Sequence, residues 1–152
     1  MRIVLFEPEI PANTGNVART CAVTGAELHL IKPLGFSIDD KHLKRAGLDY
    51  WHQLKVCLHD NLQSLFEEYP EGRFIYLSTK GKKRYSDFQF REDDFLVFGK
   101  ETAGLPRQIL EGNQEYTLRI PMLPDRRSMN LSNTVAVVVF ETLRQLGFPE
   151  MV

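Results

Sequence analysis

Short runs of apolar residues alternate along the chain with longer stretches in which apolar positions recur at helical spacing. The short runs are typical of strands covered on both faces of a parallel sheet, and the periodic stretches are typical of amphipathic helices. The predicted strands cover 3–6, 27–31, 55–58, 73–79, 95–98 and 116–120. The predicted helices cover 39–46, 61–69, 107–110 and 130–146, and an earlier one follows the cap candidates Asn13 and Thr14 and ends at Gly25.

Strands that alternate with helices, without hairpin turn signals, predict an α/β fold with a mostly parallel sheet flanked by helices. The first strand, the first helix and the second strand form a βαβ unit, for which a right-handed crossover is expected. With 152 residues the chain has the usual size of one domain, so we expect a single domain over 1–152.

The net charge of the chain limits the kinds of binding partner that it can have. The chain has 19 Lys and Arg residues against 20 Asp and Glu residues, a formal net charge of −1, which argues against a generic polyanion binder. Basic residues nevertheless gather within 41–45, within 80–84 and at 126–127. Because local patches can bind a nucleic acid whatever the net charge, RNA stays open as a partner.

Metal, disulfide and membrane functions find little support in the sequence. Cys21 and Cys57 are too few and too far apart for a zinc site or a disulfide framework, and the four histidines lack metal-ligand spacing, so no metal is expected. Glu7 and Pro8 interrupt the apolar start before a signal peptide could form, and the longest apolar run, 135–140, is far too short for a membrane span. We therefore expect a cytoplasmic protein with two reduced thiols and no membrane partner.

Three loops that leave predicted strand ends carry unusual polar content: 13–19, 99–106 and 122–133. In an open α/β sheet, ligands bind beyond the carboxyl ends of the strands, so these loops are the candidate site. Taken singly, Gly15 and Gly104 are more often turn glycines, and Asn13 and Asn130 are more often helix caps. The occurrence of all three loops together favours a ligand site, and the absence of a Walker A or GxGxxG pattern argues against a nucleoside triphosphate or a dinucleotide.

Taken together, these segments resemble the SPOUT class of RNA methyltransferases, in its SpoU/TrmH-like 2'-O-ribose branch. The three motifs of that branch correspond to 13–20, to 98–106 and to 120–122 with 128–133, in the family's order and over essentially the whole chain. The short length, the opening 7–11 and the segment 39–50 are similar to one subgroup, the tRNA (cytidine(34)-2'-O)-methyltransferases.

The resemblance implies several features that periodicity does not reveal. It implies a C-terminal deep trefoil knot, a homodimer whose active site is shared between subunits, and S-adenosyl-L-methionine as methyl donor, with S-adenosyl-L-homocysteine as product. The donor would be held largely by backbone, with apolar walls from Leu77 and Ile120. The implied donor-binding residues are Leu77, Ser78, Thr79, Gly99, Glu101, Ile120, Met122, Ser128 and Leu131.

The resemblance also implies a reaction, namely methyl transfer to the ribose 2'-hydroxyl of the wobble nucleotide of a tRNA, cytidine or uridine 34, in leucine isoacceptors. Arg19 would act near that hydroxyl, with Asn13, Glu101, Ser128 and Asn130 orienting the reactants. Arginine is effectively always protonated, so we interpret Arg19 as stabilising developing oxyanion or phosphate charge rather than as a base.

The tRNA anticodon stem-loop would be bound by basic side chains of the domain itself. The candidates are Arg19, Lys41, Arg45, Lys80, Lys82, Lys83 and Arg126. Two alternatives stay open at this point: a related 2'-O-methyltransferase that acts on rRNA or on another tRNA position, and a non-catalytic knotted RNA-binding protein.

Overall fold

The computed structural model describes residues 1–38 and 54–152, and within them seven strands form one sheet in the order β3-β2-β1-β6-β4-β7-β5. The strand bounds are β1 Arg2–Phe6, β2 Glu27–Ile31, β3 Val56–His59, β4 Phe74–Leu77, β5 Lys83–Arg84, β6 Phe95–Phe98 and β7 Thr117–Arg119. Neighbouring strands pair in parallel, and in the centre Ile3 of β1 and Ile75 of β4 both pair with Leu96 of β6. This confirms the predicted α/β class with a parallel sheet.

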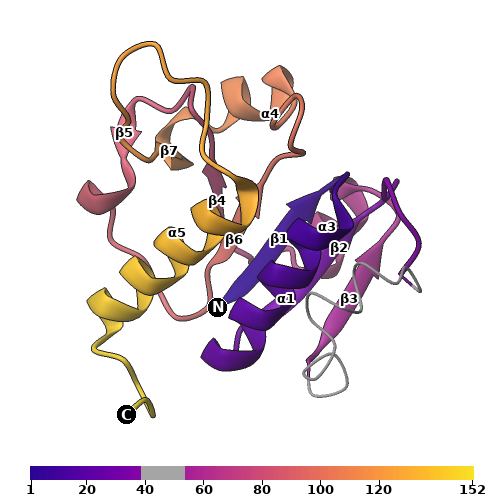
Figure 1. Ribbon diagram of the computed structural model, residues 1–152, viewed down its shortest axis with the longest axis horizontal. Helices are drawn as coiled ribbons and strands as arrows, with labels where there is room; N and C mark the ends of the chain where they lie inside the picture. Colours follow the sequence, from indigo (N-terminus) through magenta and orange to yellow (C-terminus); the bar gives the residue numbers. More distant parts are fainter. Residues whose placement is uncertain (39–53) are drawn as a thin grey trace.

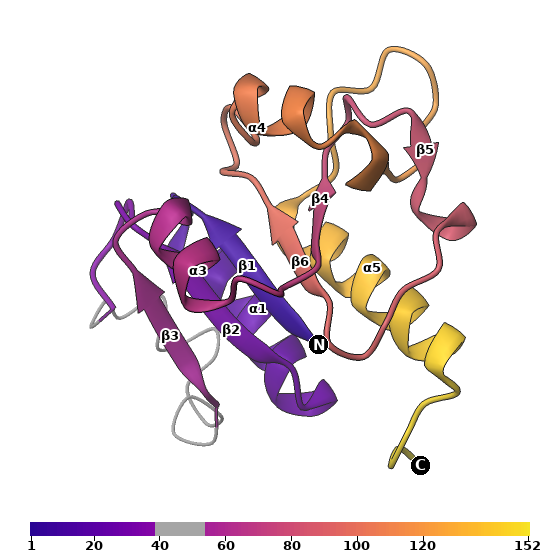
Figure 2. The ribbon, with the colours of Figure 1, turned by 180° about the vertical axis from the view of Figure 1, so that it is seen from behind.

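Helices cover both faces of this sheet. The longer helices are α1, Pro11–Thr24, and α5, Leu131–Leu146; the shorter ones are α3, Leu62–Glu68, and α4, Arg107–Gly112, with single 3-10 turns at Tyr85–Asp87 and Gln114–Tyr116. Helices α1 and α5 lie side by side on one face (Figure 1), and α3 and α4 lie on the other (Figure 2).

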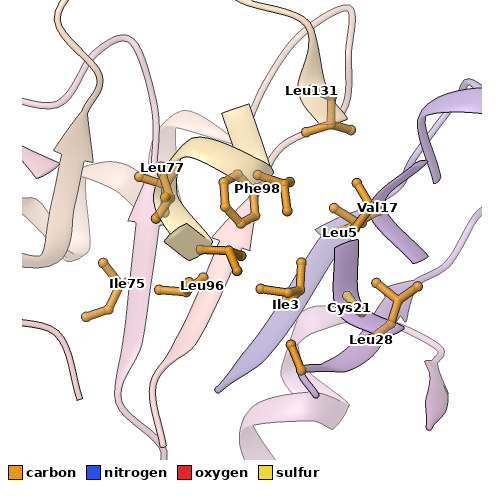
Figure 3. Close-up of a cluster of buried hydrophobic side chains, with 14 of the residues drawn as sticks. Ile3, Leu5, Val17, Cys21, Leu28, Ile75, Leu77, Leu96, Phe98 and Leu131 are labelled. Atoms are coloured by element: carbon orange, nitrogen blue, oxygen red, sulfur yellow. The ribbon is translucent and has the colours of Figure 1, made fainter. Parts of the chain in front are cut away.

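Each face of the sheet has its own apolar core. Under α1 and α5, side chains from β1, β4 and β6 meet Val17 and Cys21 of α1, with Leu131 at the start of α5 (Figure 3). Under α3 and α4, Leu65 and Leu110 pack on the opposite face. Strands buried on both faces explain the unbroken apolar runs in the sequence.

Two predictions of local structure were wrong. Helix α1 begins at Pro11, with Ile10 as extended N-cap, so Asn13 and Thr14 are buried inside the helix rather than capping it; proline suits the first helical position, where its missing N–H costs nothing. No strand was predicted in the basic segment 80–84, but its end, Lys83–Arg84, pairs with β7 as β5. The predicted helix 39–46 lies outside the described residues.

Two polar pairs are buried in the fold. Asp94, fully buried before β6, accepts two hydrogen bonds from the Arg73 guanidinium and one from the Arg91 backbone N–H. Nδ1 of buried His29 lies 2.9 Å from Nε2 of His59, and His29 also faces the carboxylate of Glu27 at 3.5 Å. None of the helices in the described residues combines the length and apolar character needed to cross a bilayer.

Candidate active site

A cavity of about 600 Å³ lies beyond the carboxyl ends of β4, β6 and β7, where the second and third polar loops approach the start of α1. It brings together most of the residues singled out from the sequence. Its lining includes Asn13, Leu77, Ser78, Thr79, Gly99, Glu101, Ile120, Met122, Ser128, Asn130 and Leu131. The predicted donor-binding residues therefore share one cavity, and four of the five predicted catalytic residues lie in it.

The loop after β6 folds back tightly on itself. The Gly104 N–H donates to the Lys100 carbonyl at 2.8 Å, and Gly104 has a φ of +70°, a conformation that favours glycine. A Cβ on Gly99 would lie 2.2 Å from the carbonyl carbon of Gly104, so only glycine fits at this crossing. The second motif thus needs both glycines to bring its backbone to the cavity wall.

Two carboxylates clasp this loop to the segment before α1. Glu101 accepts hydrogen bonds from the backbone N–H groups of Glu9, at 2.9 Å, and Ile10, at 3.2 Å. Glu9 in return accepts from the backbone N–H and the hydroxyl of Thr102, and these bonds hold the pKa of Glu9 below its usual range. A reciprocal clasp of this kind fixes the first and second motifs relative to each other.

An ion pair extends the clasp. The Lys100 ammonium donates to Glu7 at 2.8 Å, and this contact raises the pKa of Lys100. Sequence reasoning assigned no individual role to Glu7, Glu9, Lys100 or Thr102. The partners are more than 90 positions apart along the chain, so only their three-dimensional placement reveals the pairing.

A chain of hydrogen bonds then joins all three motifs. Asn130 is the N-cap of α5, and its Oδ1 accepts from the backbone N–H groups of Ser132, at 2.9 Å, and Asn133, at 3.3 Å. Its Nδ2 must therefore point away from the helix, and it donates to Oδ1 of Asn13 at 3.0 Å. Nδ2 of Asn13 in turn donates to Oε1 of Glu101 at 3.1 Å.

The direction of this chain follows from the helix cap. Backbone N–H groups can only donate, so they require the amide oxygen of Asn130 to face the helix and its N–H to face Asn13. This N–H fixes the orientation of the Asn13 amide, whose own N–H then points to the carboxylate of Glu101. Asn13 and Asn130 thus hold each other and Glu101 at one edge of the cavity. The cap role expected for Asn130 is confirmed, while Asn13 acts from inside α1.

Other candidate residues lie elsewhere. Arg19 is exposed on α1, six positions after Asn13, and is not part of the cavity lining. Lys80 lines the cavity; of the two arginines at 126–127 it is Arg127, not Arg126, that does so. Lys82 and Lys83 are exposed on the connection to β5 and in β5 itself, and Lys41 and Arg45 lie outside the described residues.

The lining of the cavity combines polar and apolar side chains. Within the described residues, no group of three or more His, Cys, Asp or Glu side chains is placed to hold a metal ion. Hydroxyls of Ser78, Thr79 and Ser128 and the apolar side chains of Leu77 and Ile120 form walls of contrasting polarity. Such a cavity fits a ligand that has both a flat heterocycle and charged groups.

Comparison with known proteins adds a family to this geometry. The model of the SpoU rRNA Methylase family matches residues 1–140. The tRNA (cytidine(34)-2'-O)-methyltransferase of Saccharophagus degradans is 56% identical over 147 residues, which cover 96% of this chain and 96% of that protein.

Two solved structures are similar in fold. One, described by the words "Structural insights into the 2-OH methylation of C/U34 on tRNA", has a TM-score of 0.92 at 46% identity and covers 96% of this chain and 95% of the other. The SpoU methyltransferase AviRb from Streptomyces viridochromogenes, in complex with the cofactor AdoMet, has a TM-score of 0.85 at 22% identity and covers 96% of this chain and 57% of the other.

Proposed function

The chain belongs to the SpoU rRNA Methylase family, and we propose that it transfers a methyl group from S-adenosyl-L-methionine to the ribose 2'-hydroxyl of nucleotide 34 of tRNA. The observation that carries the proposal is the hydrogen-bonded chain from Asn130 through Asn13 to Glu101, which unites three distant motifs at one cavity. The relatives named for this reaction match over nearly the full length of the chain, which favours tRNA over rRNA as substrate.

The residues of the cavity fit S-adenosyl-L-methionine. When bound, this donor supplies a methyl group on a sulfonium that is already strongly electrophilic. Leu77 and Ile120, which line the cavity, would flank the adenine, and the loop 99–104, whose glycines let backbone come close, would bind its polar edge. The protein's part is then to align the ribose hydroxyl with the donor and to exclude water.

Arg19 enters this proposal through a homodimer. It is exposed on α1 and is not among the residues that line the cavity of its own subunit, so we assign it to the cavity of the partner subunit, near the target ribose. Val23 on α1, 58% exposed, and Phe140 on α5, 47% exposed, are large apolar side chains suited to a subunit interface. There the Arg19 guanidinium stabilises the charge that develops on the hydroxyl or its phosphate.

The Arg19→Lys variant tests this role across pH. A guanidinium offers a planar fork of N–H donors that an ammonium cannot copy, so we expect the methylation rate to fall at every pH without a shift of the profile. A rate close to that of the unaltered enzyme contradicts a specific guanidinium role. Size-exclusion chromatography tests the dimer, because a fully active monomer contradicts a shared site.

A C-terminal trefoil knot is also part of the proposal. Its support is the position of β7, which inserts between β4 and β5 although both precede it in the chain. The segment after β7 lines the cavity at Ile120, Met122 and 127–131. It leads into α5, which lies beside α1 (Figure 1). The knot would place the third motif over the donor. An experimental backbone trace through 78–84 and 119–131 tests this threading.

Basic side chains around the cavity are proposed to bind the anticodon stem-loop in the cytoplasm, where tRNA is modified. Arg126, Lys82 and Lys83, together with Lys80, are exposed near the cavity or on the connection to β5. Lys41 and Arg45 remain candidates from the sequence.

Tritium transfer from labelled S-adenosyl-L-methionine to bulk tRNA and to bulk rRNA tests the reaction. We expect label in tRNA alone. Label only in rRNA would assign the protein to another substrate of the family, and label in neither would favour a binding protein without turnover.

A further inference from the structure

A second cavity, of about 340 Å³, lies beside the turn that follows β4 and shares Lys80 with the donor cavity. Its floor is formed by Leu110 of α4 and Thr117 of β7, both buried. Its rim carries Lys80, Lys82 and Arg107. Three cations around a partly apolar floor are suited to a nucleotide, with its base on the floor and its phosphate at the rim.

The turn between the two cavities is held rigidly. The Gly81 N–H donates to the Ser78 carbonyl at 3.1 Å, and the Lys80 N–H donates to the Ser78 hydroxyl at 3.2 Å. A Cβ on Gly81 would lie 2.6 Å from the carbonyl carbon of Leu118, so the turn packs directly on the backbone of β7. Lys80 lines both cavities, which makes them adjacent compartments along one surface.

The charge balance of the second cavity is positive. Against its three cations stands one carboxylate, Glu111, which accepts a hydrogen bond from Nε of Arg107. The Arg107 side chain is 82% exposed, and a guanidinium has five N–H donors in all, so it can bind a phosphate while it keeps this partner. Glu111 competes with that phosphate for the guanidinium.

We propose that the second cavity binds a nucleotide next to the methylated one, with its phosphodiester held by Lys80, Lys82 and Arg107. This inference rests on the proposed function, because that proposal puts the target ribose at the donor cavity and the shared Lys80 makes the second cavity its neighbour. Arg107 thereby becomes an RNA-binding residue that the sequence did not reveal. It lies at the start of α4, directly after the loop of the second motif.

Fluorescence anisotropy with a labelled anticodon stem-loop RNA, combined with methyl-transfer kinetics, tests this assignment. When the logarithm of the binding constant is plotted against the logarithm of the salt concentration, each phosphate contact on a single strand contributes about 0.7 to the slope. At about 0.1 M salt this corresponds to roughly fivefold in affinity. We therefore expect Lys82→Ala and Arg107→Ala each to weaken RNA binding by roughly fivefold and the double variant by roughly 25-fold, with a slope smaller by about 1.4.

Two further variants sharpen the test, one through the direction in which RNA affinity changes and one as a control. Glu111→Gln should tighten RNA binding, because it removes the competing carboxylate, and a purely structural role of the Arg107–Glu111 pair predicts the opposite or no change. Arg91→Ala is the matched control, since Arg91 is an exposed cation at the far, amino-terminal end of β6. In turnover, KM for tRNA should rise in Lys82→Ala and Arg107→Ala while kcat and the affinity for S-adenosyl-L-methionine stay unchanged.

The outcomes separate this inference from the proposed reaction. If the unaltered protein methylates tRNA but the Lys82 and Arg107 variants bind RNA like the Arg91 control, the second-cavity assignment is overturned alone. If the variants lose RNA affinity as expected but the unaltered protein transfers no methyl group, the proposed reaction is overturned and the cavity stands as an RNA site. If the unaltered protein binds no RNA, both are overturned.

Discussion

The chain of hydrogen bonds through Asn13 predicts which of two substitutions, Asn13→Asp or Asn13→Ala, lowers the free energy of unfolding more. Asn13 is 6% exposed, accepts from Asn130 and donates to Glu101. Asn13→Asp keeps the shape of the side chain and the acceptor for Asn130, but it replaces the N–H donor with a carboxylate oxygen that faces Oε1 of Glu101. Asn13→Ala removes both hydrogen bonds without adding charge.

The magnitude follows from the distance. Two unit charges at the 3.1 Å of the present contact repel by about 5 kcal/mol at an effective dielectric constant of about 20. Because Glu101 is partly exposed, solvent reduces this to about 2–3 kcal/mol. Loss of a charge-assisted hydrogen bond adds about 2 kcal/mol in either variant. We expect Asn13→Ala to lower the free energy of unfolding by about 2 kcal/mol and Asn13→Asp by about 4–5 kcal/mol near neutral pH.

Urea denaturation followed by circular dichroism, at fixed protein concentration, measures the difference. With a slope of about 2 kcal/mol per M, the Asn13→Asp midpoint should lie about 1 M below that of Asn13→Ala at about pH 7.5. The neighbouring negative charge and burial raise the pKa of the introduced carboxyl in the folded protein. The penalty is therefore present above that folded pKa and is relieved as the pH falls through it.

Acidification should thus bring the two variants together, because the protonated carboxyl can donate to Glu101 as the amide did. Other groups that titrate in this range affect both variants equally, so their difference isolates the new contact. An Asn13→Asp variant that equals or exceeds Asn13→Ala in stability at about pH 7.5, or a gap that does not close in acid, would refute the direction assigned to the chain.

Three further predictions concern stability and reactivity. Asp94→Asn should cost about 3–5 kcal/mol in urea denaturation, because it leaves the partly buried Arg73 guanidinium without its charged partner, yet it should leave the affinity for S-adenosyl-L-methionine unchanged. Burial and a neighbouring histidine lower the pKa of His29 to about 4, so its contribution to stability is present above pH 6.5 and is lost as the pH falls toward 4. The loss of stability reaches about 2 kcal/mol at about pH 5. The thermal unfolding temperature of His29→Gln should therefore vary less with pH across this range. Burial raises the pKa of the Cys21 thiol to about 12, so a thiol reagent at about pH 8 should label Cys57 in the native protein and Cys21 only after denaturation.

Much of the fold followed from the sequence because its strands are buried on both faces. The apolar runs at β1, β2 and β6 predict strands without reference to neighbouring segments. Helices α1 and α5 end at Gly25 and Gly147, both with positive φ, where the sequence predicts their ends. The N-cap at Asn130 was also predictable, since its side chain bonds to residues two and three positions on.

The start of α1 and the strand β5 could not be predicted in the same way. Asn13 has the chemistry of a cap, but Pro11 provides a fixed φ two positions earlier, and the amide is used instead to join the other motifs. The pair Lys83–Arg84 has no strand character of its own; it becomes β5 only through pairing with β7, more than 30 positions away.

For the site, the sequence predicted which residues take part but not which residues they contact. Glu101 and Asn130 stand out as polar residues in loops that follow strands, and both line the cavity. Glu9 and Thr102 form ordinary polar loop positions in the sequence, and Arg107 appears as a surface residue of a short helix. The significance of Glu9 and Thr102 comes from their contact with each other, 93 positions apart along the chain, and that of Arg107 comes from the cavity that it lines together with Lys80 and Lys82.

The most direct test of the proposed reaction is to map the modified nucleotide. tRNA from a strain that lacks this protein is incubated with the purified enzyme and S-adenosyl-L-methionine, and the ribose methylation is located by nuclease digestion and mass spectrometry. The account predicts a new 2'-O-methyl group at nucleotide 34 of tRNA, on cytidine or uridine. Methylation at another position, on a base, or on rRNA alone would contradict it.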